Sequence, residues 1–216
     1  MSMKNVNFKP ALVVILAIGL FTYACSTKVE ENNRSASLLT VTNVTGQQAN
    51  SNGSGFTAST PLLSDTCDSP NTASQLPENC TVFNDDADID FANDFLQIGP
   101  GLGNGTSFLN DIMVTQYRVD YFRPNGRNTP GVDVPFGIDG SMNIRIPINS
   151  TGTASIIIVR HEAKREAPLA ELDAGGSEGV LTANAQMKFF GQDLAGRNVT
   201  ATGFLEIHFA NYGESQ

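Results

Sequence analysis

The sequence contains no tryptophan, only three cysteines and two histidines, and fewer basic than acidic residues. Thirteen Lys and Arg stand against 22 Asp and Glu, which gives a net charge of -9. An acidic surface repels the phosphate backbone, so we expect no nucleic acid among the partners.

Long apolar runs are also scarce, and the clearest one covers residues 11–21 near the N-terminus. Lys4 and Lys9 precede this run, and Ala24 and Cys25 follow shortly after it. The run is too short to span a bilayer comfortably as a helix. The pattern therefore predicts a cleaved signal peptide over residues 1–24 rather than a permanent anchor.

Cys25 follows a small residue at the end of this segment, and the arrangement resembles the lipobox of bacterial lipoproteins. The resemblance implies that Cys25 is acylated and becomes the first residue of the mature chain. Ser26 stands where that family's inner-membrane retention signal has Asp, which implies an outer-membrane lipid anchor in a bacterial cell envelope, with the domain periplasmic or surface-exposed. Thr22 and Tyr23 depart from the family's usual residues, and cleavage by ordinary signal peptidase nearby is the alternative.

The first residues of the mature chain are polar, so residues 25–37 are predicted to form a lipidated tether. Loss of residues 1–24, which contain two lysines and no acid, leaves 11 basic and 22 acidic residues and a net charge of about -11. Such a surface repels anionic lipid headgroups. Membrane contact must then come from acyl chains, each buried methylene contributing about 0.8 kcal/mol. The expected partners are the membrane, through this anchor, and other envelope proteins.

Cys67 and Cys80 remain once Cys25 is assigned to the anchor, and an even pair in an oxidising compartment predicts a disulfide. The bridge would pin an irregular loop over about residues 46–80, which is rich in Gly, Ser, Asn, Thr and Pro. A disulfide that closes a loop of this size is expected to stabilise the fold by about 3 kcal/mol through the loss of chain entropy in the unfolded state. A zinc site is the weaker alternative, because it would require His161 and His208 beside both thiols.

Alternation of polar and apolar side chains marks the expected strands. Residues 181–189 and 199–209 alternate on both sides of a turn-rich linker, which predicts a β-hairpin. Residues 163–172 predict one short helix between two strands, with Pro168 suited to its first turn. Seven strands are expected, with starts at Leu38, Asp86, Asp111, Met142, Ser155, Leu181 and Val199.

This pattern predicts an all-β fold, a single immunoglobulin-like β-sandwich of about seven antiparallel strands over residues 38–216. The linker at residues 190–198 resembles the last hairpin turn of many bacterial immunoglobulin-like and fibronectin-like domains, where an Asp-x-Ala-Gly-Asn turn recurs; Arg197 interrupts it here. Together with the lipobox, the chain resembles small bacterial lipoproteins of unassigned function. The resemblance implies no catalytic residue.

Side-chain parity in the hairpin predicts that Phe189 and its alternating neighbours face the core. Lys188 and Glu206 would lie on the opposite face, where they could be cross-strand neighbours. Phe204 falls on that polar face, and we expect it to pack under a long loop rather than to mark a contact surface.

Asp86, Asp88 and Asp90 have the alternate spacing that opens a calcium-binding loop. An EF-hand is excluded, because Phe91 and Gln97 stand where that loop needs Gly and Glu. A looser calcium site remains as the alternative to a solvated acidic strand face.

A basic cluster lies at residues 160–165, and we expect its members, including His161 and Lys164, to be solvated or paired with local acids. No set of residues in the sequence converges on a catalytic motif, so we expect no enzymatic activity and no cofactor other than calcium. The first hypothesis is a non-enzymatic cell-envelope lipoprotein that acts as a structural or interaction module. The alternative is a calcium- or carbohydrate-binding β-sandwich that uses loops at one end.

Overall fold

Strands dominate the part of the chain that the computed structural model describes, which comprises residues 35–49, 55–67, 81–96, 107–173 and 179–212. All of these residues belong to one compact unit, Ser35–Gln216. The predicted signal peptide, Cys25 and Cys80 lie outside the described residues. Within the described ranges, no helix has the length and apolar character needed to cross a membrane.

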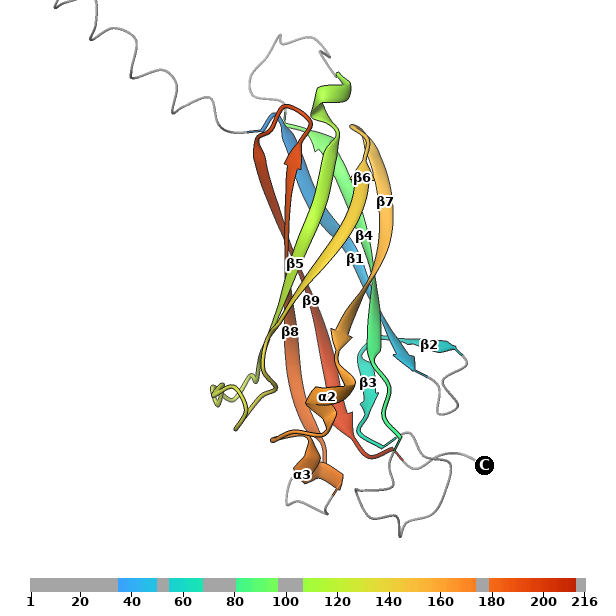
Figure 1. Ribbon diagram of the computed structural model, residues 1–216, viewed down its shortest axis with the longest axis vertical. Coiled ribbons are helices and arrows are strands. Elements are labelled where there is room, and N and C mark those ends of the chain that lie inside the picture. The colour runs from blue at the N-terminus through green and yellow to red at the C-terminus, as the bar shows by residue number, and fades with distance from the viewer. Residues whose placement is uncertain (1–34, 50–54, 68–80, 97–106, 174–178, 213–216) are drawn as a thin grey trace, which may run out of the picture. The chain divides into compact units, whose positions relative to one another are not determined.

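The first sheet has four antiparallel strands in the order β2-β1-β4-β7 (Figure 1). Their bounds are Ser37–Ala49 for β1, Phe56–Ser59 for β2, Asp85–Phe95 for β4 and Ser150–Val159 for β7. β4 lies between β1 and β7 and pairs with both along most of its length. Its side chains therefore face either the core or an outer surface flanked by two neighbouring strands.

The second sheet has five strands in the order β3-β9-β8-β5-β6. Their bounds are Leu62–Asp65 for β3, Asn198–Ala210 for β9, Leu181–Asp193 for β8, Ile112–Phe122 for β5 and Ile138–Ile146 for β6. β3 runs parallel to β9, with Leu62 opposite Ile207, whereas the other neighbours are antiparallel. The hairpin predicted from the alternation is β8 and β9.

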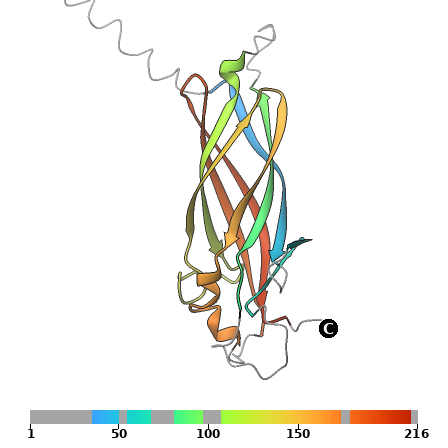
Figure 2. The same ribbon diagram turned by 45° about the vertical axis from the view of Figure 1, so that its right-hand side comes forward.

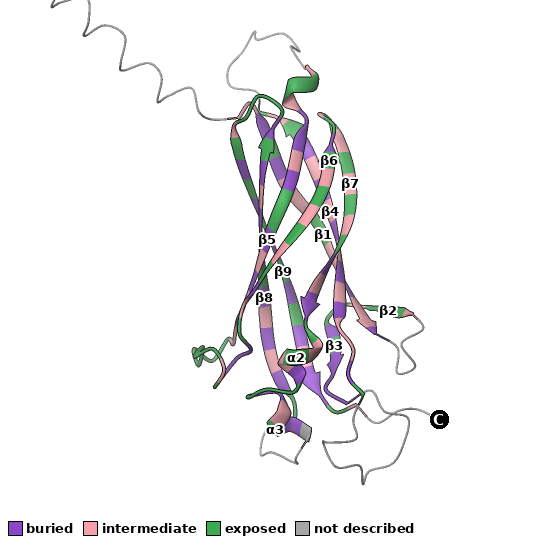
Figure 3. Ribbon diagram, viewed as in Figure 1, coloured by how far each residue is buried: buried purple, intermediate pink, exposed green. Residues whose placement is uncertain are grey.

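The two sheets enclose one core, and the turned view in Figure 2 shows their strands facing each other. Phe91 of β4 and Phe189 of β8 meet edge to face across the sheets, with ring centroids 4.8 Å apart. Buried and exposed residues alternate along the strands, as Figure 3 shows for β8 and β9. This two-residue period is the reason that the sequence forms strands here, because it gives each strand one apolar face to bury.

The predicted all-β class is confirmed. Five of the seven predicted strand starts are correct to within one residue, whereas β6 and β7 begin at Ile138 and Ser150 rather than at Met142 and Ser155. β2 and β3 were not predicted, because they lie in the segment expected to be an irregular loop over residues 46–80. That expectation is wrong where these strands form and where β1 continues to Ala49. Short edge strands need little apolar patterning, so a polar composition did not reveal them.

The single helix predicted over residues 163–172 is also wrong. Two four-residue helices are present instead, α2 at His161–Lys164 and α3 at Ala170–Asp173. Pro168 lies between them rather than in a first helical turn. Proline disfavours helical backbone at the residue before it, which explains why the two helices do not join.

The register of the hairpin corrects two further expectations. Lys188 lies opposite Thr202, and Glu206 lies opposite Asn184, so Lys188 and Glu206 are not neighbours. The turn fixes this register, because the Asp193 N–H donates to the carbonyl of Arg197 at 2.9 Å. Phe204 is 56% exposed and does not pack under a loop as predicted.

Candidate functional site

The acidic row of β4, defined as Asp86, Asp88 and Asp90, lies on the outer face of the first sheet. It does so because Ala87, Ile89 and Phe91, which alternate with these acids, are completely buried in the core. The face that carries the row was therefore predicted correctly from parity.

Side chains of the two flanking strands donate hydrogen bonds to the row. Asp88 accepts from the Gln47 amide on β1 at 2.7 Å and from the Ser155 hydroxyl on β7. Asp90 accepts from the Thr153 hydroxyl on β7 at 2.6 Å and from the Asn43 amide on β1 at 3.2 Å. Each of these two carboxylates thus links three strands across the outer surface of the sheet.

The local environment shifts the pKa values of two acids of the row in opposite directions. Burial raises the pKa of Asp86 above its ordinary value, and the nearby charges of Asp85 and Asp88 raise it further. The hydrogen bonds from Thr153 and Asn43 lower the pKa of Asp90. Asp86 and Asp90 are therefore held in different protonation environments on the same face of β4.

The spacing of the row argues against a calcium site, which the sequence left open as the alternative to a solvated acidic strand face. Side chains on one face of a strand repeat about every 6.6 Å, whereas calcium ligands must all lie within about 2.6 Å of one ion. Among the described residues, no group of three or more His, Cys, Asp and Glu side chains is placed to hold a metal ion. Asp88 and Asp90 therefore serve the sheet as hydrogen-bond acceptors in this structure.

A buried ion pair lies at the first residue of β4. Lys164 Nζ of α2 is 3.0 Å from Oδ2 of Asp85, and the two side chains are 0% and 1% exposed. Asp85 also accepts from the Ser64 hydroxyl at 2.7 Å and from the Ala49 N–H at 3.2 Å. Lys164 Nζ makes this ion pair without a hydrogen bond of regular geometry in the described part of the chain.

The strand pairing explains why these residues meet. Asp85 lies opposite Val159, the last residue of β7, and α2 begins at His161. One helical turn then returns Lys164 to the start of β4. Burial raises the pKa of Asp85, although the Lys164 charge and the hydrogen bonds from Ser64 and Ala49 lower it. Removing two charges from water carries a large desolvation penalty, so each partner depends on the other.

This ion pair was missed at the level of sequence. Lys164 was expected to be solvated or paired at the surface, but it is 1% exposed. Parity could have placed Asp85 in the core, since it lies two residues before Ala87 on the same face of β4. Nothing in the local sequence indicates that Lys164 would cover it.

The two histidines each contact a carboxylate. His161 Nε2 is 3.2 Å from Glu162, while its backbone N–H donates to the Asn84 side-chain oxygen at 2.8 Å. His208 Nε2 is 2.6 Å from Glu206 on the outer face of β9. The hydroxyl nucleophile that an acyl-transfer site needs is not among these contacts in the described residues.

The second sheet carries a shallow hollow of about 350 Å³ beside β5, β6 and β8. It lies where β5 has an irregular register with both β6 and β8, between Val114 and Gln116. Neither histidine lines it. The lining residues are Gln116, Tyr117, Asp139, Gly140, Ser141 and Phe190.

Cys67 is 8% exposed and disulfide-bonded. Its predicted partner, Cys80, lies outside the described residues, so the pairing stays a prediction. A disulfide at Cys67 is incompatible with the weaker zinc alternative, which required this thiol as a ligand.

The chain was compared with protein-family models and with curated proteins. No protein-family model matches the chain, and no curated protein matches it.

Proposed function

We propose that the protein is a non-enzymatic lipoprotein of the bacterial cell envelope, in which an immunoglobulin-like β-sandwich serves as a structural or interaction module. Acylated Cys25 holds the chain on the outer membrane. The folded domain then projects from the membrane on a short tether.

The observation that carries this proposal is the targeting pattern at the start of the chain. Basic residues come first, an apolar run follows, and the pattern ends at Cys25, directly after a small residue. The described domain starts at Ser35, and β1 begins at Ser37, where the predicted tether ends. A lipid-anchored domain requires this succession of anchor, short polar segment and folded unit.

The strand order supports the immunoglobulin-like part of the proposal. The long strands pair in the order β1-β4-β7 in one sheet and β9-β8-β5-β6 in the other. In an immunoglobulin-like sandwich, the first, second and fifth strands share one sheet, while the third pairs with the sixth and the sixth with the last. β6, the fourth of the long strands, departs from this scheme, because it lies beside β5 rather than in the sheet of β1, β4 and β7, where the scheme has its fourth strand.

Two polar clusters within the described ranges make their contacts inside the fold. The acidic row links β1, β4 and β7, and the pair of Asp85 and Lys164 joins α2 to β4. Such contacts stabilise the fold, as expected of a structural or interaction module.

Metabolic labelling with a fatty acid tests the anchor. The wild-type chain should incorporate the label, Cys25→Ser should lose it, and the neighbouring control Ser26→Ala should keep it. Label that persists in Cys25→Ser, or is absent from the wild type, would refute the proposal. Membrane fractionation of Ser26→Asp tests the sorting, because this change should move the protein from the outer to the inner membrane.

A further inference from the structure

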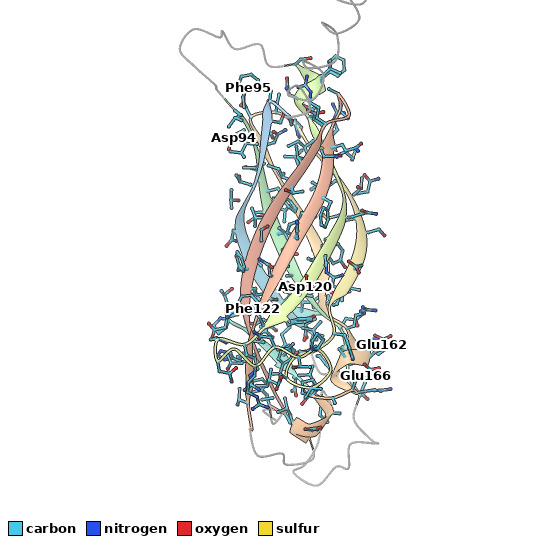
Figure 4. All side chains as sticks on the ribbon, turned by 90° about the vertical axis from the view of Figure 1, so that its left-hand side faces the viewer. Asp94, Phe95, Asp120, Phe122, Glu162 and Glu166 are labelled. Carbon is cyan, nitrogen blue, oxygen red and sulfur yellow. The ribbon has the colours of Figure 1, made fainter. Side chains whose placement is uncertain are left out.

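The end of the sandwich at which the chain enters the domain, here called the anchor-side end, carries exposed apolar side chains from four segments. These segments are the start of β1, the end of β4, the 3-10 helix η2 at Phe108–Asn110, and the β8–β9 turn. Figure 4 places Asp94 and Phe95 at this end, far from Glu162 and Glu166.

Hydrogen bonds join the segments of the anchor-side end to one another. The Leu96 N–H donates to the Ala36 carbonyl at 2.7 Å, and the Ser37 hydroxyl donates to the Asn110 carbonyl at 2.6 Å. The Leu194 N–H donates to the Asp111 carbonyl at 3.0 Å. The four segments therefore lie next to one another at this end.

Five large apolar side chains of this surface are exposed to solvent. Phe108 is the most exposed, at 67%. Apolar groups gathered in this way mark contact with another apolar phase or protein. The other four are Leu38, Leu96, Leu109 and Leu194.

The length of the chain before the domain indicates what this surface contacts. Residues 26–34 separate the proposed acylated Cys25 from Ser35 and reach at most about 30 Å when extended. A flexible chain of this length spans only about 15 to 20 Å on average. The anchor-side end is thus held close to the bilayer, whereas the far end of β1 lies about 40 Å further along the strand.

We propose that the anchor-side end contacts the lipid bilayer, with Phe108 and its neighbouring leucines inserted at the interface. This inference rests on the proposed anchor at Cys25. The contact depends on apolar burial, because the acidic net charge of the chain does not attract anionic headgroups. Phe136, at 58% exposure in the loop between β5 and β6, is equally apolar but belongs to the opposite end. It remains in water.

A single introduced tryptophan tests the contact, because the sequence has none of its own. The full-length lipidated protein carrying Phe108→Trp is reconstituted into phosphatidylcholine vesicles, with Phe136→Trp as the matched control. The tryptophan at position 108 should emit at shorter wavelength on vesicles and be quenched by brominated lipid. The tryptophan at position 136 should show neither effect. Leu194→Trp supplies a second reporter if the first variant does not fold.

Three results would overturn the inference in distinguishable ways. If the protein floats with the vesicles but both tryptophans behave alike, the anchor stands and the contact is refuted. If the protein does not float, the anchor fails and the contact falls with it. If the emission at position 108 shifts with protein concentration in detergent without vesicles, the surface binds a second copy of this chain instead.

Discussion

Replacing Lys164 by methionine probes the buried ion pair while keeping an unbranched side chain of similar length. The change leaves the Asp85 carboxylate buried, with the Ser64 hydroxyl and the Ala49 N–H as its remaining hydrogen-bond donors. Breaking a buried pair by removing one partner costs about 3 to 5 kcal/mol. We expect a loss of this size in the free energy of unfolding at pH 7, measured by urea denaturation.

The pH dependence of this loss follows from the carboxyl group. Without the Lys164 charge, the pKa of Asp85 should rise further above its ordinary value of 3.8. A carboxyl whose pKa is raised in the folded state contributes stability below the pKa of the unfolded chain and loses it as pH rises through the folded pKa. The deficit of Lys164→Met relative to wild type should therefore be smaller at pH 5 than at pH 8.

Two further variants separate charge from packing. Arg165→Met changes the adjacent exposed residue and should stay within about 0.5 kcal/mol of wild type. The double variant Asp85→Asn/Lys164→Met removes both charges and should recover much of the single variant's loss. A loss below about 0.5 kcal/mol for Lys164→Met would refute the reasoning, because it would mean that the ammonium is solvated and that α2 does not cover the start of β4.

Other regions give further expectations. Phe189→Ala should cost about 3 to 5 kcal/mol in urea melts because it opens a cavity beside Phe91, whereas Lys188→Ala should cost less than about 1 kcal/mol; reversed costs would mean that β8 faces the other way. Burial raises the pKa of Asp111, but the Ile148 N–H and the Arg145 charge lower it below its ordinary value overall. The stability that this group contributes is present above about pH 3.8 and is lost as pH falls through the folded pKa. Arg145→Ala should therefore lose less stability than wild type between pH 5 and 2.5, as measured by urea midpoints. Equal slopes for the two proteins would contradict this. Millimolar calcium should leave the thermal midpoint unchanged, since the β4 acids do not converge, and a rise would restore the calcium site.

The long strands could be predicted because each one needs a single apolar face, and the two-residue period reports that need directly. Ala87, Ile89 and Phe91 are buried as their spacing indicates, and so are Met187 and Phe189. β3 could not be predicted in this way. It is four residues long and is held by backbone pairing to β9, a strand more than a hundred residues later in the chain.

Side-chain partners depend on register and on chain reversal, which alternation does not encode. Lys188 could not be assigned a cross-strand partner until the turn at Asp193 was known. Lys164 reaches Asp85 only because β7 ends beside the start of β4 and the chain then turns through α2. The acids of β4 could be placed on the outer face, but their donors on β1 and β7 emerge only when three strands are aligned.

The intact mass of the protein extracted from bacterial membranes tests the central claim most directly. A lipid-anchored domain predicts a chain that begins at Cys25, with an excess mass corresponding to acyl groups and localised to that residue by fragmentation. A chain that begins at another residue, or one that begins at Cys25 with no added mass, would contradict the anchor and with it the proposed contact between the anchor-side end and the bilayer.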